Sequence, residues 1–273
     1  MNPLIVNVAL TGCLFSQEDS EHLPVTAEEI ATDAARCYDA GASVFHVHAR
    51  EPGSHVPTWR KEVYAALLGR LRQRLPADAL ICVSTSGRHW GEYEKRADVL
   101  RLDGIDMASL TVGTVDFPSG PSVTTTEMLR KLAIRMYERG IVPELELFNI
   151  NRLYQLRALH VTGHLLDPLY TNLFFGEKAG LKPSPATFTH AVALLPEGCV
   201  WGATGLGHCQ FEVNCWAVAM GGHVRVGLED SLWMSKGIKA TNVAQVERIV
   251  KVARSMGREP ATTKEARVMI WQE

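Results

Sequence analysis

Long apolar runs and a large net charge are both missing from this sequence of 273 residues. No uninterrupted apolar stretch reaches the roughly 18 residues that a membrane-spanning helix needs. The 28 basic and 30 acidic side chains give a formal net charge of −2, which argues against nucleic acid or an anionic membrane as the main partner. We therefore expect a soluble, globular protein.

The cysteines show no metal-binding or redox spacing, because none of the six belongs to a C-x-x-C pair. That pattern predicts reduced thiols packed in a cytosolic protein. The stretch Leu10-Thr11-Gly12-Cys13 superficially resembles a lipoprotein cleavage box. No Lys or Arg precedes it, however, and Asn7 interrupts the apolar run, so the parts of a signal peptide are lacking. We expect a cytoplasmic protein.

No linker rich in Pro, Gly or Ser divides the chain, so residues 1–273 are predicted to form a single domain. Strand-like and helix-like segments alternate throughout. The expected strands are residues 4–10, 43–48, 79–84, 107–112, 142–148, 170–175, 199–203 and 224–228. Helical patterns lie at 26–41, 61–75, 93–102, 126–139, 151–160, 185–195, 211–220 and 242–256. Thr26 and Glu29 form a predicted capping box at the first helix.

This alternation with short connections favours a closed (β/α)8 TIM barrel. An open, doubly wound sheet is the second reading. An extra C-terminal helix is expected over residues 262–272, where we expect it to pack on a neighbouring subunit.

The barrel hypothesis places polar residues together, since the carboxyl ends of parallel strands meet at one rim. His46 and His48 end the second strand and lie on the same strand face, because side chains alternate with period two. Glu229 ends the last strand. Two imidazoles and one carboxylate form the ligand set of a catalytic zinc ion (Zn2+) with an open position. Glu229 and its neighbour Asp230 can both enter the site only if the backbone bends after Gly227.

The same rim offers acid-base chemistry. A bound metal would polarise the ketone of a β-keto acid, and Asp230 is the candidate base for the acidified proton. Arg225 has two readings that are compatible: it clamps a substrate carboxylate, or it forms a structural ion pair with Glu144 in the barrel mouth. Ser84 and Gly87 suit a carboxylate-binding turn, although an ordinary strand-to-helix turn would look the same.

Other signals at the rim are weaker. Gly205-Leu206-Gly207 precedes a helix and could bind an anion through backbone N–H groups. His208 lies beside it and is the one further histidine of interest. The remaining histidines have no partner spacing and are predicted to be packing or surface residues: His55, His89, His160, His164, His190 and His223.

Over essentially its whole length the chain resembles the β-keto acid cleavage enzymes, typified by the 3-keto-5-aminohexanoate cleavage enzyme. The resemblance rests on His46-Val47-His48-Ala49-Arg50, the turn from Ser84 to Gly87, Met107-Ala108-Ser109-Leu110 and Pro143-Glu144-Leu145-Glu146. The longest matching stretch runs from Gly221 to Asp230.

The resemblance implies a zinc-dependent barrel that condenses a β-keto acid with acetyl-CoA, giving acetoacetate and a new acyl-CoA. By position, His46, His48 and Glu229 would hold the metal. The keto acid would contact Ser84, Gly87 and Ser109. Asp230, Arg225 and Glu144 would form the acid-base and electrostatic group, with Asp230 removing the proton between ketone and carboxylate. A homotetramer is also implied.

One position departs from the family pattern. In the aminohexanoate-cleaving members an acid shortly after the first strand receives the substrate ammonium, and here that position is Leu14. Because an apolar side chain cannot pair with a buried ammonium, we predict an uncharged or apolar distal group on the substrate.

Three other readings stay open at this point. An amidohydrolase-like hydrolase also uses H-x-H in a barrel, but on the first strand and with a lysine and further histidines on strands five and six. A metal-dependent aldolase or lyase would need no CoA. A metal-binding scaffold would have no activity.

Overall fold

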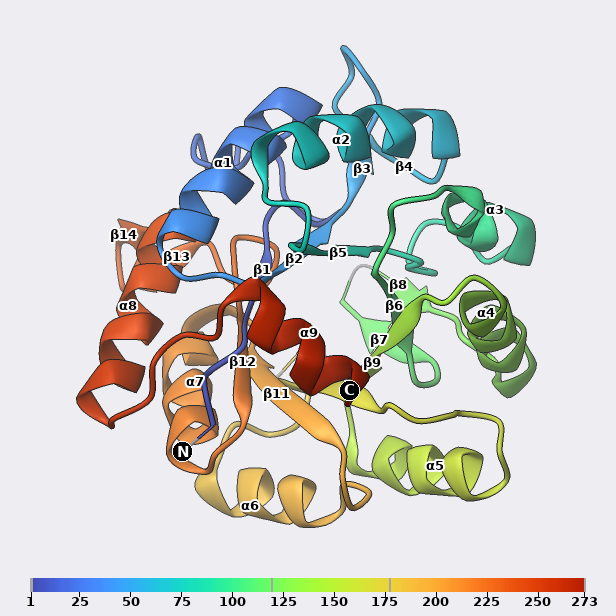
Figure 1. Cartoon of the computed structure of the whole chain (residues 1–273), viewed down its shortest axis with the longest axis vertical. Helices are drawn as coiled ribbons and strands as arrows, with labels where there is room; N and C mark the ends of the chain where they lie inside the picture. Colours follow the sequence, from blue (N-terminus) through green and yellow to red (C-terminus); the bar gives the residue numbers. More distant parts are fainter. Residues whose placement is uncertain (1, 119, 177, 273) are drawn as a thin grey trace.

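The computed structural model describes residues 2–118, 120–176 and 178–272. Within them, eight parallel strands close into a barrel surrounded by helices (Figure 1). β1 pairs with both β2 and β12, which closes the sheet. The barrel strands are β1 (Val6–Ala9), β2 (Val44–Val47), β5 (Leu80–Val83), β6 (Met107–Thr111), β9 (Val142–Leu147), β10 (Tyr170–Phe175), β11 (Val200–Gly205) and β12 (His223–Val226). The predicted (β/α)8 barrel is confirmed and the open sheet is wrong.

The helices follow the predicted order. They are α1 (Ala27–Asp39), α2 (Lys61–Arg74), α3 (Tyr93–Ala97), α4 (Thr126–Glu138), α5 (Ile150–Val161), α6 (Pro185–Ala193), α7 (Gln210–Ala219) and α8 (Asn242–Ser255). The predicted capping box of α1 is present, with Thr26 and Glu29 each bonded to the other's backbone N–H. The helix expected over 93–102 is shorter, because α3 gives way to a 3-10 turn, η1 (Val99–Arg101).

The barrel interior changes character along its axis. At the amino ends of the strands it is filled by an apolar layer that includes Ile5, Val44 and Leu80. Polar side chains occupy the levels above, where Asn7, His46, Glu144, Asn172 and Arg225 are all buried. Outside the barrel, an apolar layer packs the strands against the helices. The chemistry-bearing residues therefore lie toward the carboxyl ends, supported from below by an apolar plug.

The C-terminal helix α9 (Thr263–Trp271) lies across the amino end of the barrel (Figure 1). Its buried residues Ala266 and Ile270 join the apolar layer formed by Ile5 and Val44. Arg267 also pairs with Asp106, just before β6. The buried face of this helix therefore closes its own barrel. The expected packing on a neighbouring subunit stays a prediction for its exposed face.

Short antiparallel hairpins that the sequence did not predict extend the opposite rim. They are β3–β4 (Ala49–Arg50, Pro57–Thr58), β7–β8 (Val115–Phe117, Gly120–Ser122) and β13–β14 (Trp233–Ser235, Ile238–Lys239). Each hairpin follows the carboxyl end of a barrel strand, so together they surround the opening of the barrel at that end. No helix in the described part of the chain is both long and apolar enough to cross a membrane.

Candidate active site

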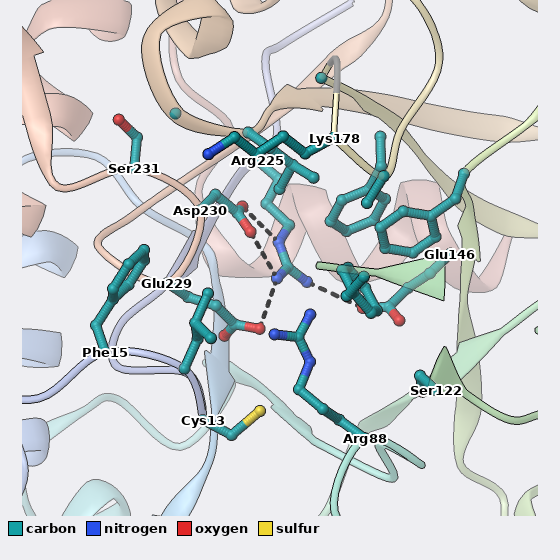
Figure 2. A pocket seen from close by; sticks show the side chains of 18 of the residues that line it. Cys13, Phe15, Arg88, Ser122, Glu146, Lys178, Arg225, Glu229, Asp230 and Ser231 are labelled. Carbon is teal, nitrogen blue, oxygen red and sulfur yellow. Dashed lines mark hydrogen bonds and ion pairs between the residues drawn. The ribbon is translucent and has the colours of Figure 1, made fainter. Parts of the chain in front are cut away.

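A cavity of about 680 Å³ opens at the carboxyl end of the barrel. Its size suits a small-molecule ligand. The predicted site residues that line it are Leu14, His48, Ser84, Ser109, Arg225, Glu229 and Asp230. Figure 2 shows side chains from opposite walls converging on its centre.

The three predicted metal ligands meet at the floor of this cavity. His46 Nε2 lies 3.3 Å from His48 Nε2 and 3.5 Å from Glu229 Oε2, and His48 Nε2 lies 3.2 Å from Glu229 Oε1. Ligand atoms about 2.0–2.1 Å from a tetrahedral zinc ion are separated by about 3.3 Å, so this triangle has the right edges. Within the described residues, the buried Glu229 Oε2 has no hydrogen-bond partner. The donor set therefore fits a divalent ion.

Two glycines allow Glu229 and Asp230 to enter the site together. Gly227 has a φ of +133°, and Asp230 N donates a hydrogen bond of 3.2 Å to its carbonyl. This is the predicted bend. Gly12 supports Glu229 from the facing loop, where a Cβ would lie 2.6 Å from Glu229 Cγ. A side chain at either glycine would displace backbone or ligand.

Glu144 lies beneath the metal triangle rather than in the cavity. Its Oε2 is 2.7 Å from His46 Nδ1, and its Oε1 accepts hydrogen bonds of 2.6 Å from the side-chain amides of Asn7 and Asn172. Although burial opposes ionisation, the charges of His46 and Arg225 lower the pKa of Glu144 to about 2. A carboxylate on the far nitrogen orients a metal-binding imidazole and increases its basicity.

Arg225 is fully buried and forms ion pairs with the acidic side chains of the site. Its Nε lies 2.9 Å from Asp230 Oδ2, its Nη2 3.1 Å from Glu229 Oε1, and its Nη1 3.3 Å from Glu146 Oε1 (Figure 2). The distance to Glu144 Oε1 is 3.5 Å. Arg225 is therefore paired with Glu144, as one reading expected, and it also faces the cavity. Its binding of a substrate carboxylate stays a prediction.

Asp230 and Glu146 are the titratable acids beside this guanidinium. Burial, opposed by Arg225, raises the pKa of Asp230, whose Oδ2 also accepts a hydrogen bond from Thr204. Burial likewise raises the pKa of Glu146 to about 7, and Thr111 donates a hydrogen bond of 2.7 Å to it. Glu146 lines the cavity although it was not in the predicted set. Its spacing from Glu144 places both on one strand face, with Glu146 nearer the carboxyl rim.

The predicted carboxylate turn is built around Gly87. Ser84 and Ser109 line the cavity, whereas Gly87 does not. A Cβ on Gly87 would lie 2.8 Å from Arg96 Nη1, so the guanidinium of Arg96 fills the space beneath the turn. The next residue, Arg88, points into the cavity and was not predicted.

The predicted anion site at Gly205-Leu206-Gly207 is wrong. Leu206 N donates to Phe175 O at 2.6 Å, and Gly207 N donates to Asp230 O at 2.8 Å. These N–H groups hold loops together and are not free to bind an anion. His208 does line the cavity.

Comparison with known proteins gives the chain a family. The model of the beta-keto acid cleavage enzyme family matches residues 3–271. The chain is 33% identical over 272 residues to a 3-keto-5-aminohexanoate cleavage enzyme of Acetoanaerobium sticklandii, covering 99% of this chain and 98% of that one. It is 30% identical to a 3-oxoadipate:acetyl-CoA acetyltransferase of Cupriavidus necator, covering 98% and 94%.

A solved structure, the ternary complex of ObcA with a C4-CoA adduct and oxalate, shares the fold. It superposes with a TM-score of 0.75 at 23% identity, covering 92% of this chain and 68% of that one. The family match over almost the whole chain, together with identity above 30% to full-length relatives, places this chain in the beta-keto acid cleavage enzyme family.

Proposed function

We propose that this enzyme is zinc-dependent and condenses a β-keto acid with acetyl-CoA, releasing acetoacetate and a new acyl-CoA. The observation that carries the proposal is the meeting of the His46, His48 and Glu229 triangle with Asp230 in one cavity. The named relatives that use acetyl-CoA support the co-substrate. As a member of this family, the chain is a carbon–carbon bond-cleaving enzyme.

One ion per chain would be held by His46, His48 and Glu229. Bound there, it would supply Lewis acidity that polarises the ketone of the keto acid and lowers the pKa of the neighbouring C–H. Glu144 keeps the His46 ring oriented with Nε2 toward that position.

Asp230 takes the proton from the carbon between the ketone and the carboxylate. Arg225 holds both oxygens of Asp230, at 2.9 and 3.2 Å, and so orients the base. The resulting enolate carbon attacks the thioester carbonyl of acetyl-CoA, and the CoA thiolate leaves. That thiolate then adds to the original ketone carbon. The bond between this carbon and the former enolate carbon breaks, which leaves the acyl group on CoA. The expelled acetoacetate enolate takes back the proton held by Asp230.

The proposed substrate carries no ammonium group. Leu14 lines the cavity where the aminohexanoate-cleaving members place an acid. Aromatic and aliphatic side chains continue the same walls, among them Phe15, Phe117, Leu206 and Trp233. Removing an ammonium from water against such walls costs several kcal/mol, so we propose an uncharged or apolar distal group.

The test is a panel of β-keto acids with acetyl-CoA, assayed for acetoacetate and acyl-CoA. Native protein is compared with chelator-treated protein and with His46→Ala. We expect turnover that requires acetyl-CoA, is lost on chelation and returns when zinc is added. Acetoacetate formation at the native rate by chelated enzyme would remove the metal from the mechanism. Turnover without acetyl-CoA would instead indicate an aldolase or lyase.

The hydrolase reading is not favoured. The H-x-H pair lies at the carboxyl end of β2, and strands β9 and β10 present Glu144, Glu146 and Asn172 to the interior. A metal-bridging lysine with histidines at those positions is what that chemistry would need.

We further propose that residues 1–273 form one domain and that the enzyme is a cytoplasmic homotetramer. A single cooperative unfolding transition and a molar mass of four chains by light scattering are the expected measurements. A monomeric mass at micromolar concentration would contradict the tetramer.

A further inference from the structure

Arg88 is partly buried, and it differs from the fully buried arginines near the cavity. Arg50 donates to the carbonyls of Gly12 and Phe15, and Arg96 donates to the carbonyl of Thr85. Arg225 is surrounded by carboxylates. In the described part of the chain, by contrast, the guanidinium of Arg88 has no hydrogen-bond or ion-pair partner.

The side chain of Arg88 is nonetheless held in place. Its guanidinium carbon lies 3.6 Å from the ring centre of Phe117, which forms part of the cavity wall. Its backbone N–H donates to Ser86 Oγ at 3.2 Å. Figure 2 shows the guanidinium pointing into the cavity toward the group formed by Arg225, Glu229 and Glu146. Stacking on a ring occupies one face of the guanidinium and leaves its N–H edge available.

Hydroxyl donors lie on the same side of the cavity. Ser84 Oγ accepts a hydrogen bond of 3.1 Å from Ser86 N, and Ser109 Oγ accepts one of 3.2 Å from Thr85 N. These contacts fix both oxygens and leave each O–H able to donate. Arg96 braces the turn from below, since its Nε donates to Thr85 O at 2.8 Å. The braced turn therefore holds the guanidinium of Arg88 and the hydroxyl of Ser84 at the cavity, beside the hydroxyl of Ser109.

The ion pairs around the cavity leave Arg88 without an acidic partner in the part of the chain that the structure describes. Asp230, Glu229 and Glu146 each pair with Arg225, and none of them forms an ion pair with Arg88. Among the described residues, the guanidinium of Arg88 reaches the cavity without an ion-pair partner of its own. A planar guanidinium forms its strongest hydrogen bonds with a carboxylate, and a β-keto acid brings one carboxylate.

Resting on the proposed function, we propose that Arg88 binds the carboxylate of the β-keto acid, assisted by the hydroxyls of Ser84 and Ser109. The guanidinium acts as a positioning residue that orients the acid with its ketone toward the metal triangle. It also selects the free acid over an ester of the same shape.

The test compares acetoacetate with methyl acetoacetate, which keeps the ketone but lacks the charge. Binding to the isolated enzyme is measured by calorimetry without acetyl-CoA, so that no turnover occurs. Arg88→Gln should weaken acetoacetate binding about 10- to 100-fold, the range expected for loss of a charge-assisted pair. Ester binding should change less than about threefold, and Arg88→Lys should recover part of the acid affinity. Arg60→Gln is the control, since Arg60 is half exposed and pairs with Glu51 outside the cavity.

Three results would overturn the proposal. Equal losses of affinity for the acid and the ester would show that Arg88 only packs in the cavity wall. A loss confined to 3-oxoadipate, with acetoacetate unaffected, would assign it to a second carboxylate. A higher KM for acetyl-CoA alone would assign it to the co-substrate. Failure of the proposed function is separate, because it would show as wild-type enzyme that makes no acyl-CoA from any β-keto acid.

Discussion

His46 Nδ1 and Glu144 Oε2 lie 2.7 Å apart in the barrel interior, although 98 positions separate the two residues in the chain. Glu144 has no exposed surface and is held by two asparagine amides. The contact places the proton of His46 on Nδ1, which leaves the lone pair of Nε2 facing His48 and Glu229.

The first prediction follows from this contact. Glu144→Gln should lower zinc affinity about 10- to 100-fold, because a weaker partner holds the His46 ring. Competition with a chromophoric chelator measures it. Glu146→Gln is the matched control, since that carboxylate contacts Arg225 and Thr111 instead of a ligand. Equal zinc affinity in wild type and Glu144→Gln would show that the contact does not support a metal.

A second prediction concerns Gly12. Its φ is +62°, and an added Cβ would meet Glu229 Cγ at 2.6 Å, so Gly12→Ala should displace the ligand and weaken zinc binding about tenfold or more. Gly53→Ala controls for backbone strain, because Gly53 has a φ of +85° with nothing within 4 Å of the added Cβ. Both variants should lose about 1 kcal/mol of unfolding free energy from the positive φ. Only Gly12→Ala should lose zinc, and a parallel loss in Gly53→Ala would contradict the clash.

A third prediction concerns the distal end of the substrate. Leu14→Glu places an acid at the cavity, so it should raise kcat/KM for 3-keto-5-aminohexanoate relative to an alkyl β-keto acid by about tenfold. Leu14→Gln has a similar shape without the charge and should leave that ratio within about threefold of wild type. If the wild-type kcat/KM for 3-keto-5-aminohexanoate already equalled that for the best alkyl β-keto acid, Leu14 would not set specificity.

A fourth prediction concerns stability against acid. Burial, helped by Arg258, lowers the pKa of His223 to about 3, and His223 Nδ1 accepts a hydrogen bond from Ile5 N. The unfolded chain protonates this group near pH 6.5, whereas the folded chain does so only near the lowered value. Stability from neutral His223 is therefore present above about pH 6.5 and is lost as the pH falls toward 3.

From pH 7 to pH 5 the loss should be about 2 kcal/mol. His223→Asn keeps an acceptor but does not titrate, so its urea-derived unfolding free energy should fall less between those values. His190→Asn on the exposed face of α6 is the control and should follow wild type. An unchanged pH dependence in His223→Asn would place the acid sensitivity elsewhere.

Much of the fold could be predicted because it depends on short-range rules. The alternation of segments, the cap at Thr26 and the bend at Gly227 are properties of a few neighbouring residues. His46 and His48 converge because strand periodicity puts residues two apart on one face. The hairpins at the rim escaped prediction because their strands are only two or three residues long, too short to show a period.

The exact roles of Glu144 and Glu146 could not be predicted, because both side chains face the barrel interior. They differ only in their level along the barrel axis. One lies under His46 and the other reaches the cavity. The backbone N–H groups of Leu206 and Gly207 were misassigned for a similar reason, since their acceptors come from β10 and from Asp230. Arg88 gave no signal of its own, as a lone arginine after a turn is ordinary in sequence.

By itself, then, the sequence determined the order of the elements, the barrel and the three side chains that converge at its mouth, because each follows from periodicity and strand order. Only the tertiary structure decided which acid supports His46, which acid faces the cavity, where α9 packs, and that Arg88 lacks a partner. Those outcomes depend on depth along the barrel axis and on contacts between distant segments, which local patterns do not encode.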